Sequence, residues 1–332
     1  MLRPRSMIFT FFGDYVRTRG EEIWVGSIIE LLGCFGLSEQ AIRSALSRMC
    51  RTGWLKVRKV GNRSYYSLTT KSKKMFAEGG RRIYESREST WEGKWYLLTY
   101  FIPEQKRHLR DRLRKELTWL GFGLLSNATW ISCYDLRSEV SDLVDSLQIM
   151  DRVQLFEARY TGFADGRALV AHCWDLDGIN KKYSAFMSKY RPAYENLRRR
   201  LELGEPVEAR ECFVQRVMVI HEYRKFPYID PQLPRELLAD NWLGHDAAAL
   251  FREYHNLLSA NAEAYFSEVF DKGLQRPATP IGREKPLPAA ASKSQPLPQS
   301  PKRGRKRGPR SGNVKRELGM GLTIDQLVGF SS

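Results

Sequence analysis

Residues 21–66 read EEIWVGSIIELLGCFGLSEQAIRSALSRMCRTGWLKVRKVGNRSYY, and this stretch decides the fold of the N-terminal part of the chain. Apolar residues recur at near-helical spacing over residues 22–35, which predicts a first helix. Gly36 can adopt a positive φ and break that helix, and Ser38 is of a type that commonly caps the start of another. The stretch therefore predicts two helices joined by a tight turn.

The second of these helices has two unlike faces. One face is apolar and is expected to be buried; it carries Ala41, Ile42, Ala45, Leu46 and Met49. The other offers guanidinium, amide and hydroxyl groups, which are the types that reach base edges and phosphates in a DNA major groove. The candidate DNA-binding residues around this helix are Ser38, Gln40, Arg43, Ser44, Ser47 and Arg48.

A basic hairpin is predicted after the two helices. Residues 54–60 alternate apolar and basic, Gly61-Asn62 suits a tight turn, and residues 64–68 supply a returning strand. The side chains expected to lie near phosphates are Lys56, Arg58, Lys59, Asn62 and Arg63. The alternative is a small solvated module whose charges serve only as a surface. Because the cap, the turn, the polar face and the basic hairpin agree, residues 1–74 are predicted to form a winged helix-turn-helix that binds double-stranded DNA.

Positive charge gathers at the two ends of the 332-residue chain, whose formal net charge is +16. Residues 1–74 hold 14 Lys and Arg against 5 Asp and Glu, and residues 276–332 hold 12 against 3. The positive field therefore lies where an anionic polymer could be bound. Residues 276–332 are rich in proline and basic side chains, and this composition predicts a disordered tail. Its run KRGRKRGPR (302–310) resembles an AT-hook, but Lys306 stands where that motif has proline, so an electrostatic tether is expected.

The rest of the sequence predicts a helical connector over residues 75–92 and two further domains. Residues 93–162 show the order strand, helix, strand, strand, helix, strand, which is that of a ferredoxin-like βαββαβ unit. Such a unit leaves sheet edges open, so pairing of two copies would give a homodimer with two DNA-binding domains. Residues 163–275 look mainly helical and are the candidate effector domain. The chain as a whole is expected to be of the α+β class.

Several functions find no support in the sequence. The five cysteines are widely spaced without a CxxC pair, and the five histidines show no metal-ligand spacing, so no metal site is predicted. No GxSxG, GxxxxGK[ST] or GxGxxG motif occurs, so no catalytic residue is proposed and no enzyme is expected. An apolar run long enough to span a membrane is not found. The cysteine usage and the lack of a signal-peptide pattern predict a cytoplasmic protein.

Six short motifs occur in one collinear order: IFTFFGD (8–14), EIWVGS (22–27), GNRSYY (61–66), WDL (174–176), HEYRKF (221–226) and DPQLPRELL (230–238). Together they resemble the PaaX family of repressors, which control operons for phenylacetic acid degradation. The resemblance extends over about residues 5–272, and a collinear series is more specific than any single motif. It implies a winged helix-turn-helix, a ferredoxin-like middle domain and a helical C-terminal domain. It also implies an inducer, phenylacetyl-coenzyme A, that releases the repressor from its operator, and no cofactor.

The densest part of the resemblance, residues 221–228, is the candidate effector site. An acyl-coenzyme A needs cations for its phosphates, aromatic faces for its rings and an apolar slot for its acyl end. Side chains of these types, and hence the effector-binding candidates, are His221, Tyr223, Arg224, Lys225 and Tyr228. The same residues could instead form a buried polar network, with Glu222 paired to Arg224, that holds two helices together. The sequence leaves both interpretations open.

A metal-dependent nuclease is the alternative function, because the middle domain resembles the small CRISPR-associated endonuclease that also uses a ferredoxin-like unit. That family places a metal-binding aspartate at the end of its first strand, where a divalent ion activates water. The matching position in this chain is Phe101. Since the carboxylate is missing, the middle domain is predicted to be a dimerisation scaffold without nuclease activity.

Overall fold

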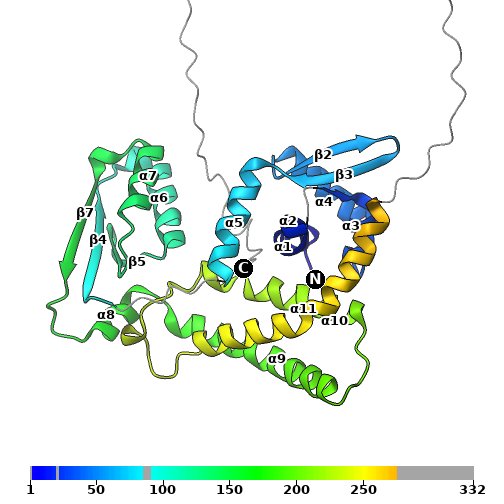
Figure 1. Cartoon of the computed structure of the whole chain (residues 1–332). Coiled ribbons are helices and arrows are strands. Elements are labelled where there is room, and N and C mark those ends of the chain that lie inside the picture. The colour runs from blue at the N-terminus through cyan, green and yellow to red at the C-terminus, as the bar shows by residue number, and fades with distance from the viewer. Residues whose placement is uncertain (1, 20–21, 85–90, 275–332) are drawn as a thin grey trace, which may run out of the picture.

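The computed structural model describes residues 2–19, 22–84 and 91–274 (Figure 1). The chain combines helices with two small sheets and a helical C-terminal region, in agreement with the predicted α+β class. Its N-terminal elements are α1 (Pro4–Phe11), the π-helical turn η1 (Phe12–Val16), α2 (Arg17–Arg19), β1 (Ile23–Trp24), α3 (Val25–Gly33), α4 (Glu39–Arg51), β2 (Leu55–Val60), β3 (Arg63–Leu68) and α5 (Thr70–Tyr84).

The predicted pair of helices is present as α3 and α4. Between them, Gly36 has a φ of 73°, the left-handed conformation that glycine adopts without steric cost. The hydroxyl oxygen of Ser38 accepts a hydrogen bond from the backbone N–H of Ala41 at 3.3 Å, and thereby caps α4. The break and the cap both lie where the sequence predicted them.

The first helix is shorter than predicted because its expected start forms a strand instead. A helix was predicted over residues 22–35, but α3 begins at Val25, and the two residues of β1 pair with Tyr66 and Tyr65 of β3. The hairpin thus becomes a three-stranded antiparallel sheet of order β1-β3-β2. A strand of two residues is too short to show the alternation that marks strands in a sequence.

The middle region contains β4 (Lys94–Tyr100), η2 (Glu104–Lys106), α6 (Arg107–Leu120), β5 (Gly123–Ser126), β6 (Thr129–Ser132), α7 (Arg137–Leu147), η3 (Met150–Arg152) and β7 (Val153–Arg159). The four strands form an antiparallel sheet of order β5-β6-β4-β7. The element order βαββαβ and this strand order fit the predicted ferredoxin-like unit. Both β5 and β7 are edge strands of this sheet.

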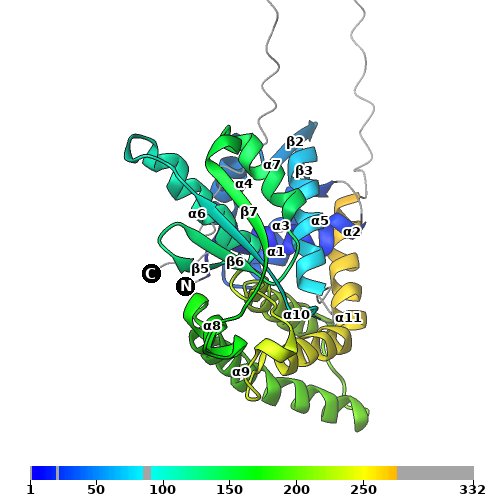
Figure 2. The same ribbon diagram turned by 90° about the vertical axis from the view of Figure 1, so that its left-hand side faces the viewer.

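The two faces of the middle sheet contact different parts of the chain, and Figure 2 shows the face that has α8 at its lower end. Leu98 and Tyr100 of β4 join a core with residues of α6 and α7, whereas Trp95 joins a second cluster with α8 (Gly166–Cys173) and residues 233–238. This division follows from the pleat of a strand, in which successive side chains point to opposite faces. The C-terminal region therefore supplies the cover for one face of the sheet.

The C-terminal region continues with α9 (Leu176–Glu202), α10 (Ala209–Tyr223), η4 (Phe226–Tyr228), η5 (Arg235–Leu237) and α11 (Gly244–Leu274). Helix α11 packs against α10 and α9, and its final turns rise to the sheet that contains β1 (Figure 1). Among the helices of residues 2–19, 22–84 and 91–274, none is both long and apolar enough to cross a membrane.

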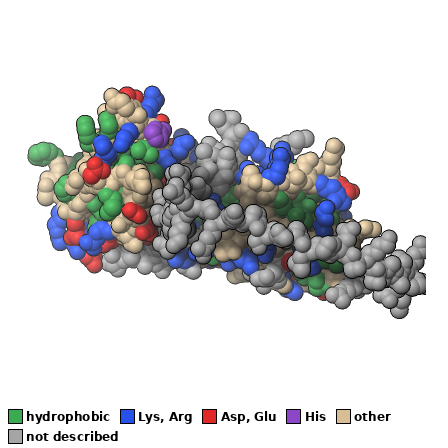
Figure 3. Space-filling view, turned by 90° about the horizontal axis from the view of Figure 1, so that it is seen from above, with side chains coloured by type: hydrophobic (Ala, Val, Ile, Leu, Met, Phe, Trp, Pro, Cys, Tyr) green, Lys and Arg blue, Asp and Glu red, His purple; other side chains and the backbone are tan. Residues whose placement is uncertain are grey.

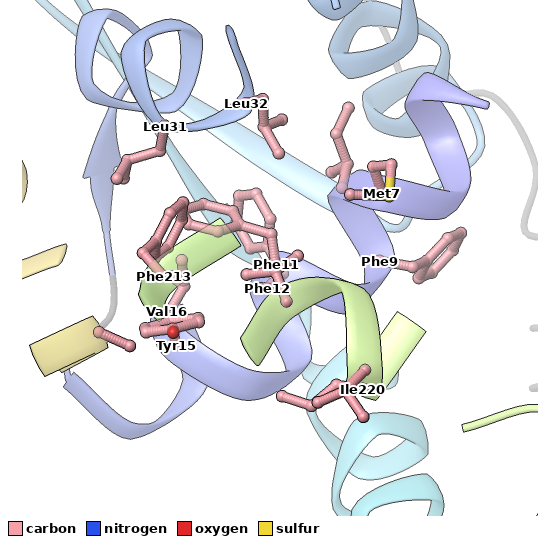
Figure 4. Packing of buried hydrophobic residues seen from close by; sticks show 14 of the residues in the cluster. Met7, Phe9, Phe11, Phe12, Tyr15, Val16, Leu31, Leu32, Phe213 and Ile220 are labelled. Carbon is pink, nitrogen blue, oxygen red and sulfur yellow. The ribbon is translucent and has the colours of Figure 1, made fainter. Parts of the chain in front are cut away.

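Helix α1 lies between α3 and α4 on one side and the C-terminal helices on the other (Figures 1 and 4). The side chains of Phe11 and Tyr15 are completely buried, with ring centroids 6.0 and 4.8 Å from that of Phe266 in α11. Phe213 of α10 lies 5.3 Å from Tyr15 by the same measure. One continuous hydrophobic core thus joins the first residues of the chain to helices that lie about 200 positions later.

The predicted division into domains, with boundaries near residues 74, 92, 162 and 275, stays a prediction. Helix α5 begins at Thr70, before the first predicted boundary, and runs into the predicted connector, of which residues 85–90 lie outside the described residues. The basic tail 276–332, with its predicted disorder and its AT-hook-like run, also lies outside the described residues.

Candidate functional site

The polar face of α4 is open to solvent along the whole helix. Its inward residues Ile42, Ala45, Leu46 and Met49 are buried, and Ala41 is half-buried. The candidate DNA-binding residues on the other face are all exposed: Gln40, Arg43, Ser44, Ser47 and Arg48. The predicted separation of an apolar and a polar face is therefore confirmed, and the polar face covers no other element.

Two of the candidates on α4 already have a partner in the free protein. Nε of Arg43 bonds to Oε1 of Glu39 at 2.7 Å, one turn earlier, and both side chains are more than half exposed. A surface pair of this kind is worth only about 0.3–0.5 kcal/mol, so a phosphate or base could replace the carboxylate at little cost. Ser38 uses its oxygen as the helix cap.

The basic hairpin presents only part of its predicted charge freely. Lys56, Lys59 and Asn62 are exposed. Arg58 is bound to Glu22, with Nη2 at 2.6 Å and Nε at 2.9 Å from Oε2 of that residue. In Figure 3, which views the molecule from the side of the hairpin, Lys and Arg side chains are visible around the N-terminal elements.

Arg63 contacts the C-terminal helix rather than the hairpin tip alone. Its guanidinium lies 4.7 Å from the ring centroid of Trp24, and its Nη1 donates to the carbonyl of Gly273 at 3.4 Å. The hydroxyl of Tyr65 donates to the same carbonyl at 3.4 Å. The last turn of a helix carries free carbonyls and partial negative charge, so these two donors stabilise the end of α11. A DNA contact by Arg63 stays a prediction.

The first candidates for the effector site tie α10 and its C-cap to α1. His221 and Arg224 are 6% and 7% exposed. Nδ1 of His221 lies 2.8 Å from the hydroxyl oxygen of Thr10, and Nη2 of Arg224 donates to the hydroxyl of Ser6 at 2.7 Å. Burial, together with the nearby charge of Arg224, lowers the pKa of His221 to about 3, so its ring is neutral at physiological pH. The two residues therefore lie in the interface between α1 and α10.

The remaining effector candidates have different surroundings. Tyr223 is buried, and its ring stacks on Phe251 with centroids 3.9 Å apart. Lys225 is half-buried. The ring of Tyr228 stacks on Trp119 of α6 at 4.6 Å. Tyr228 and Arg224 line a cavity of about 470 Å³ between α1, α5 and α10.

The alternative prediction, a buried polar network that joins helices, is present in part, but Glu222 and Arg224 have other partners than predicted. Glu222 is bonded to Lys189 of α9, and Arg224 is bonded to Ser6 of α1. The predicted Glu222–Arg224 pair is therefore replaced by two bonds to different helices. Whether any residue of this motif contacts an effector stays a prediction.

Sequence reasoning missed a buried charge cluster. Nη2 of Arg216 in α10 lies 3.3 Å from Oδ2 of Asp14 in η1, and its Nη1 lies 2.7 Å from Oε1 of Glu263 in α11. The hydroxyl of Tyr84 in α5 donates to Oδ1 of Asp14 at 3.0 Å. These residues are distant in sequence and share no motif, so only the folded chain reveals their partnership.

Three family models match the chain in sequence. They are described as "PaaX-like protein" over residues 3–72, "PaaX protein central Cas2-like domain" over residues 88–170, and "PaaX-like protein C-terminal domain" over residues 174–268. A curated relative, "Transcriptional repressor PaaX" of Escherichia coli (strain K12), is 34% identical over 268 residues, which are 79% of this chain and 83% of the relative.

A solved structure, "Uncharacterized protein Rv0674 from Mycobacterium tuberculosis", covers 75% of this chain and 91% of its own. It is 22% identical in sequence and superposes with a TM-score of 0.48.

Proposed function

Since this chain belongs to the PaaX family, we propose that it represses an operon for phenylacetate degradation and leaves its operator when phenylacetyl-coenzyme A binds. The curated relative is a transcriptional repressor and not an enzyme, and this chain is likewise a transcriptional repressor without a catalytic function. The operon, the operator contacts and the inducer are the finer parts of the proposal.

The observation that carries the DNA-binding part is the exposed polar face of α4 beside the basic hairpin. Helix α4 is capped, packs through its apolar face and presents amide, hydroxyl and guanidinium groups outward. A helix of this kind, preceded by a helix and a turn and followed by a hairpin, suits insertion into the major groove, with the hairpin beside the backbone. We assign the role of winged helix-turn-helix to α3, α4 and β1–β3.

The proposed homodimer forms through the middle region. The edge strand β7 and the loops at one end of its sheet expose large apolar side chains: Phe101 (79% exposed), Met150 (59%) and Phe156 (52%). The backbone N–H of Phe101 donates to the carbonyl of Arg152 at 2.9 Å, so the segment after β4 lies next to η3, which contains Met150. Exposed apolar groups beside an open sheet edge favour pairing with a second copy.

The nuclease alternative has no support from the site. Phe101 follows the last residue of β4 and is exposed at the position where the related endonuclease has its aspartate. Within the described residues, no group of three or more His, Cys, Asp and Glu side chains could hold a metal ion. The middle region therefore resembles a Cas2-like domain in its fold and lacks the aspartate of the related endonuclease.

The test of the proposal uses the promoter DNA of a phenylacetate gene cluster, labelled for fluorescence anisotropy. The full chain is expected to bind this DNA and to release it when phenylacetyl-coenzyme A is added, whereas coenzyme A or phenylacetate alone leaves the complex intact. Tight binding that no concentration of the thioester reverses would remove the inducer from the proposal. Binding no tighter than to random DNA would remove the operator.

A second expected result concerns the hairpin. Replacing Lys56 and Lys59 with alanine should weaken binding to operator and to random DNA by similar factors. It should also lower the slope of log affinity against log salt by about two units, because two phosphate contacts are lost. Anisotropy titrations at several salt concentrations measure both effects. The matched control replaces Lys181 and Lys182 of α9, also exposed, and should leave the slope unchanged. A loss confined to operator DNA would mean that the hairpin reads bases.

A further inference from the structure

A cavity of about 470 Å³ lies where the three regions of the chain meet. Its walls come from α1 and η1, from α5, and from the end of α10 with η4, and Trp119 of α6 closes one side. Small-molecule sites in proteins have volumes of about 300–1,000 Å³ and are mostly apolar with a few polar groups. This cavity matches that description in size and in its lining.

Aromatic side chains make up two of its walls. Phe9 lies 4.7 Å from Trp54 and 5.6 Å from Phe76 between ring centroids. In Figure 4, Phe9 points away from Phe11 and Phe12, which fill the core. The second wall is the stacked pair of Trp119 and Tyr228. These aromatic walls suit a flat apolar ligand group, because offset and edge-on contacts between rings add to the free energy gained by burying it.

Positive charge lines the cavity on its exposed side. Arg17, Lys71 and Lys74 are lining residues and are all exposed. The acidic lining residue Asp14 is balanced by Arg216, whose Nη2 lies 3.3 Å away. The cavity therefore combines an apolar interior with a cationic rim, which is the complement of an anion that carries an aromatic end.

The wall formed by α5 lies very close to its neighbours. A Cβ atom at Gly79 would lie 3.0 Å from the hydroxyl oxygen of Tyr228, and one at Gly80 would lie 3.2 Å from Nη2 of Arg17. Glycine inside a helix costs about 1 kcal/mol relative to alanine, so this pair has a packing reason. The two glycines let α5 pack closely on Tyr228 of η4 and Arg17 of α2, so a ligand wedged between these contacts would displace α5.

Movement of α5 would reach the proposed DNA-binding elements directly. The hydroxyl of Ser72 donates to the carbonyl of Trp54 at 2.6 Å, and that of Thr69 donates to the carbonyl of Gly53 at 2.9 Å. These carbonyls belong to the segment between α4 and β2, and α5 itself follows β3 after one residue. The start of α5 is thus hydrogen-bonded to the segment that joins α4 to the hairpin.

From these contacts we propose that this cavity is the effector site. It takes the aromatic acyl end of a thioester, while Arg17 and Lys74 bind the anionic part at the rim. Occupation displaces α5 and, through Trp54 and Gly53, changes the position of the hairpin relative to α4. This inference rests on the proposed function, because it takes the effector from there. Of the predicted effector residues, this site keeps Arg224 and Tyr228 and leaves out His221, Tyr223 and Lys225.

The test measures ligand binding by isothermal titration calorimetry on the full chain without DNA. Reversing two rim charges with Arg17→Glu and Lys74→Glu is expected to weaken the binding of phenylacetyl-coenzyme A by about tenfold or more, since charged hydrogen bonds are lost. The matched control, Lys73→Glu with Arg81→Glu, changes the net charge of the chain equally, at exposed positions of α5 outside the cavity, and should bind like the wild type.

A second variant tests the apolar interior. Met75→Trp adds bulk to a lining residue and is expected to reduce thioester binding without changing the rim charge. Binding of coenzyme A alone as tight as that of the thioester would exclude the acyl group from the cavity. If the wild type binds the thioester and both cavity variants bind it equally well, the assignment of the effector site to this cavity is wrong, and the proposed effector stands. If the wild type binds no thioester, the effector of the proposed function is wrong, and this site falls with it.

Discussion

Replacing Arg216 with alanine is expected to destabilise the folded chain by about 3–5 kcal/mol, because a buried carboxylate then loses its cation. The side chains of Arg216 and Asp14 are only 8% and 7% exposed. The same guanidinium bonds to Glu263 at 2.7 Å and lies 4.7 Å from the ring centroid of Tyr15. The free energy of unfolding, obtained from urea titrations followed by circular dichroism, measures the effect.

The matched control for this variant is Arg198→Ala. Arg198 bonds to Glu202 at 2.8 Å, but both side chains are 61% exposed, so the pair is worth at most about 1 kcal/mol. A loss in Arg216→Ala no larger than the loss in Arg198→Ala would show that the buried cluster does not hold η1, α10 and α11 together.

Removing the polar face of α4 is expected to abolish operator recognition and leave folding intact. The variant replaces Arg43, Ser44, Ser47 and Arg48 with alanine. A good bidentate contact between an arginine and a base is worth about 1–3 kcal/mol, so the loss of two such contacts brings operator affinity close to that for random DNA. Folding is unaffected because these side chains are exposed and α4 packs through its other face.

The matching control replaces Arg191 and Arg199, two exposed residues of α9, and this helix lies on the side of the molecule opposite the hairpin (Figure 1). This control removes the same number of guanidinium groups and is expected to keep operator preference. Competition between labelled operator and unlabelled random DNA measures that preference. Retained preference in the α4 variant, with an unchanged unfolding free energy, would mean that another element reads the operator.

Local patterns were sufficient for most of the elements. The glycine turn, the serine cap and the two-faced helix α4 depend on neighbouring residues, so the structure of residues 36–51 can be predicted from the local sequence. The same holds for the strands and helices of the ferredoxin-like unit, whose order alone specifies the sheet. Strand β1 escaped prediction because its two residues are strand only through their pairing with β3.

The features that the sequence did not reveal all depend on contacts between distant residues. Arg63 reads as one more hairpin cation, yet its neighbour across the fold is the carbonyl of Gly273. The Asp14–Arg216 pair joins residues about 200 positions apart. The cavity likewise draws its lining from distant segments, and of the stretch 221–228 that carried the effector prediction only Arg224 and Tyr228 line it.

The burial of α1 among α3, α4, α10 and α11 has a consequence for the order of events on the ribosome. Phe11 and Tyr15 leave the exit tunnel about 200 residues before Phe213 and Phe266 can cover them. At about 5–20 residues per second, that interval is about 10–40 s, during which Phe11 and Tyr15 lack their contacts with α10 and α11. The segment from α1 to β3 therefore depends on α10 and α11 for part of its core. Grafted onto another regulator without α10 and α11, this segment would expose the aromatic side chains that these two helices cover.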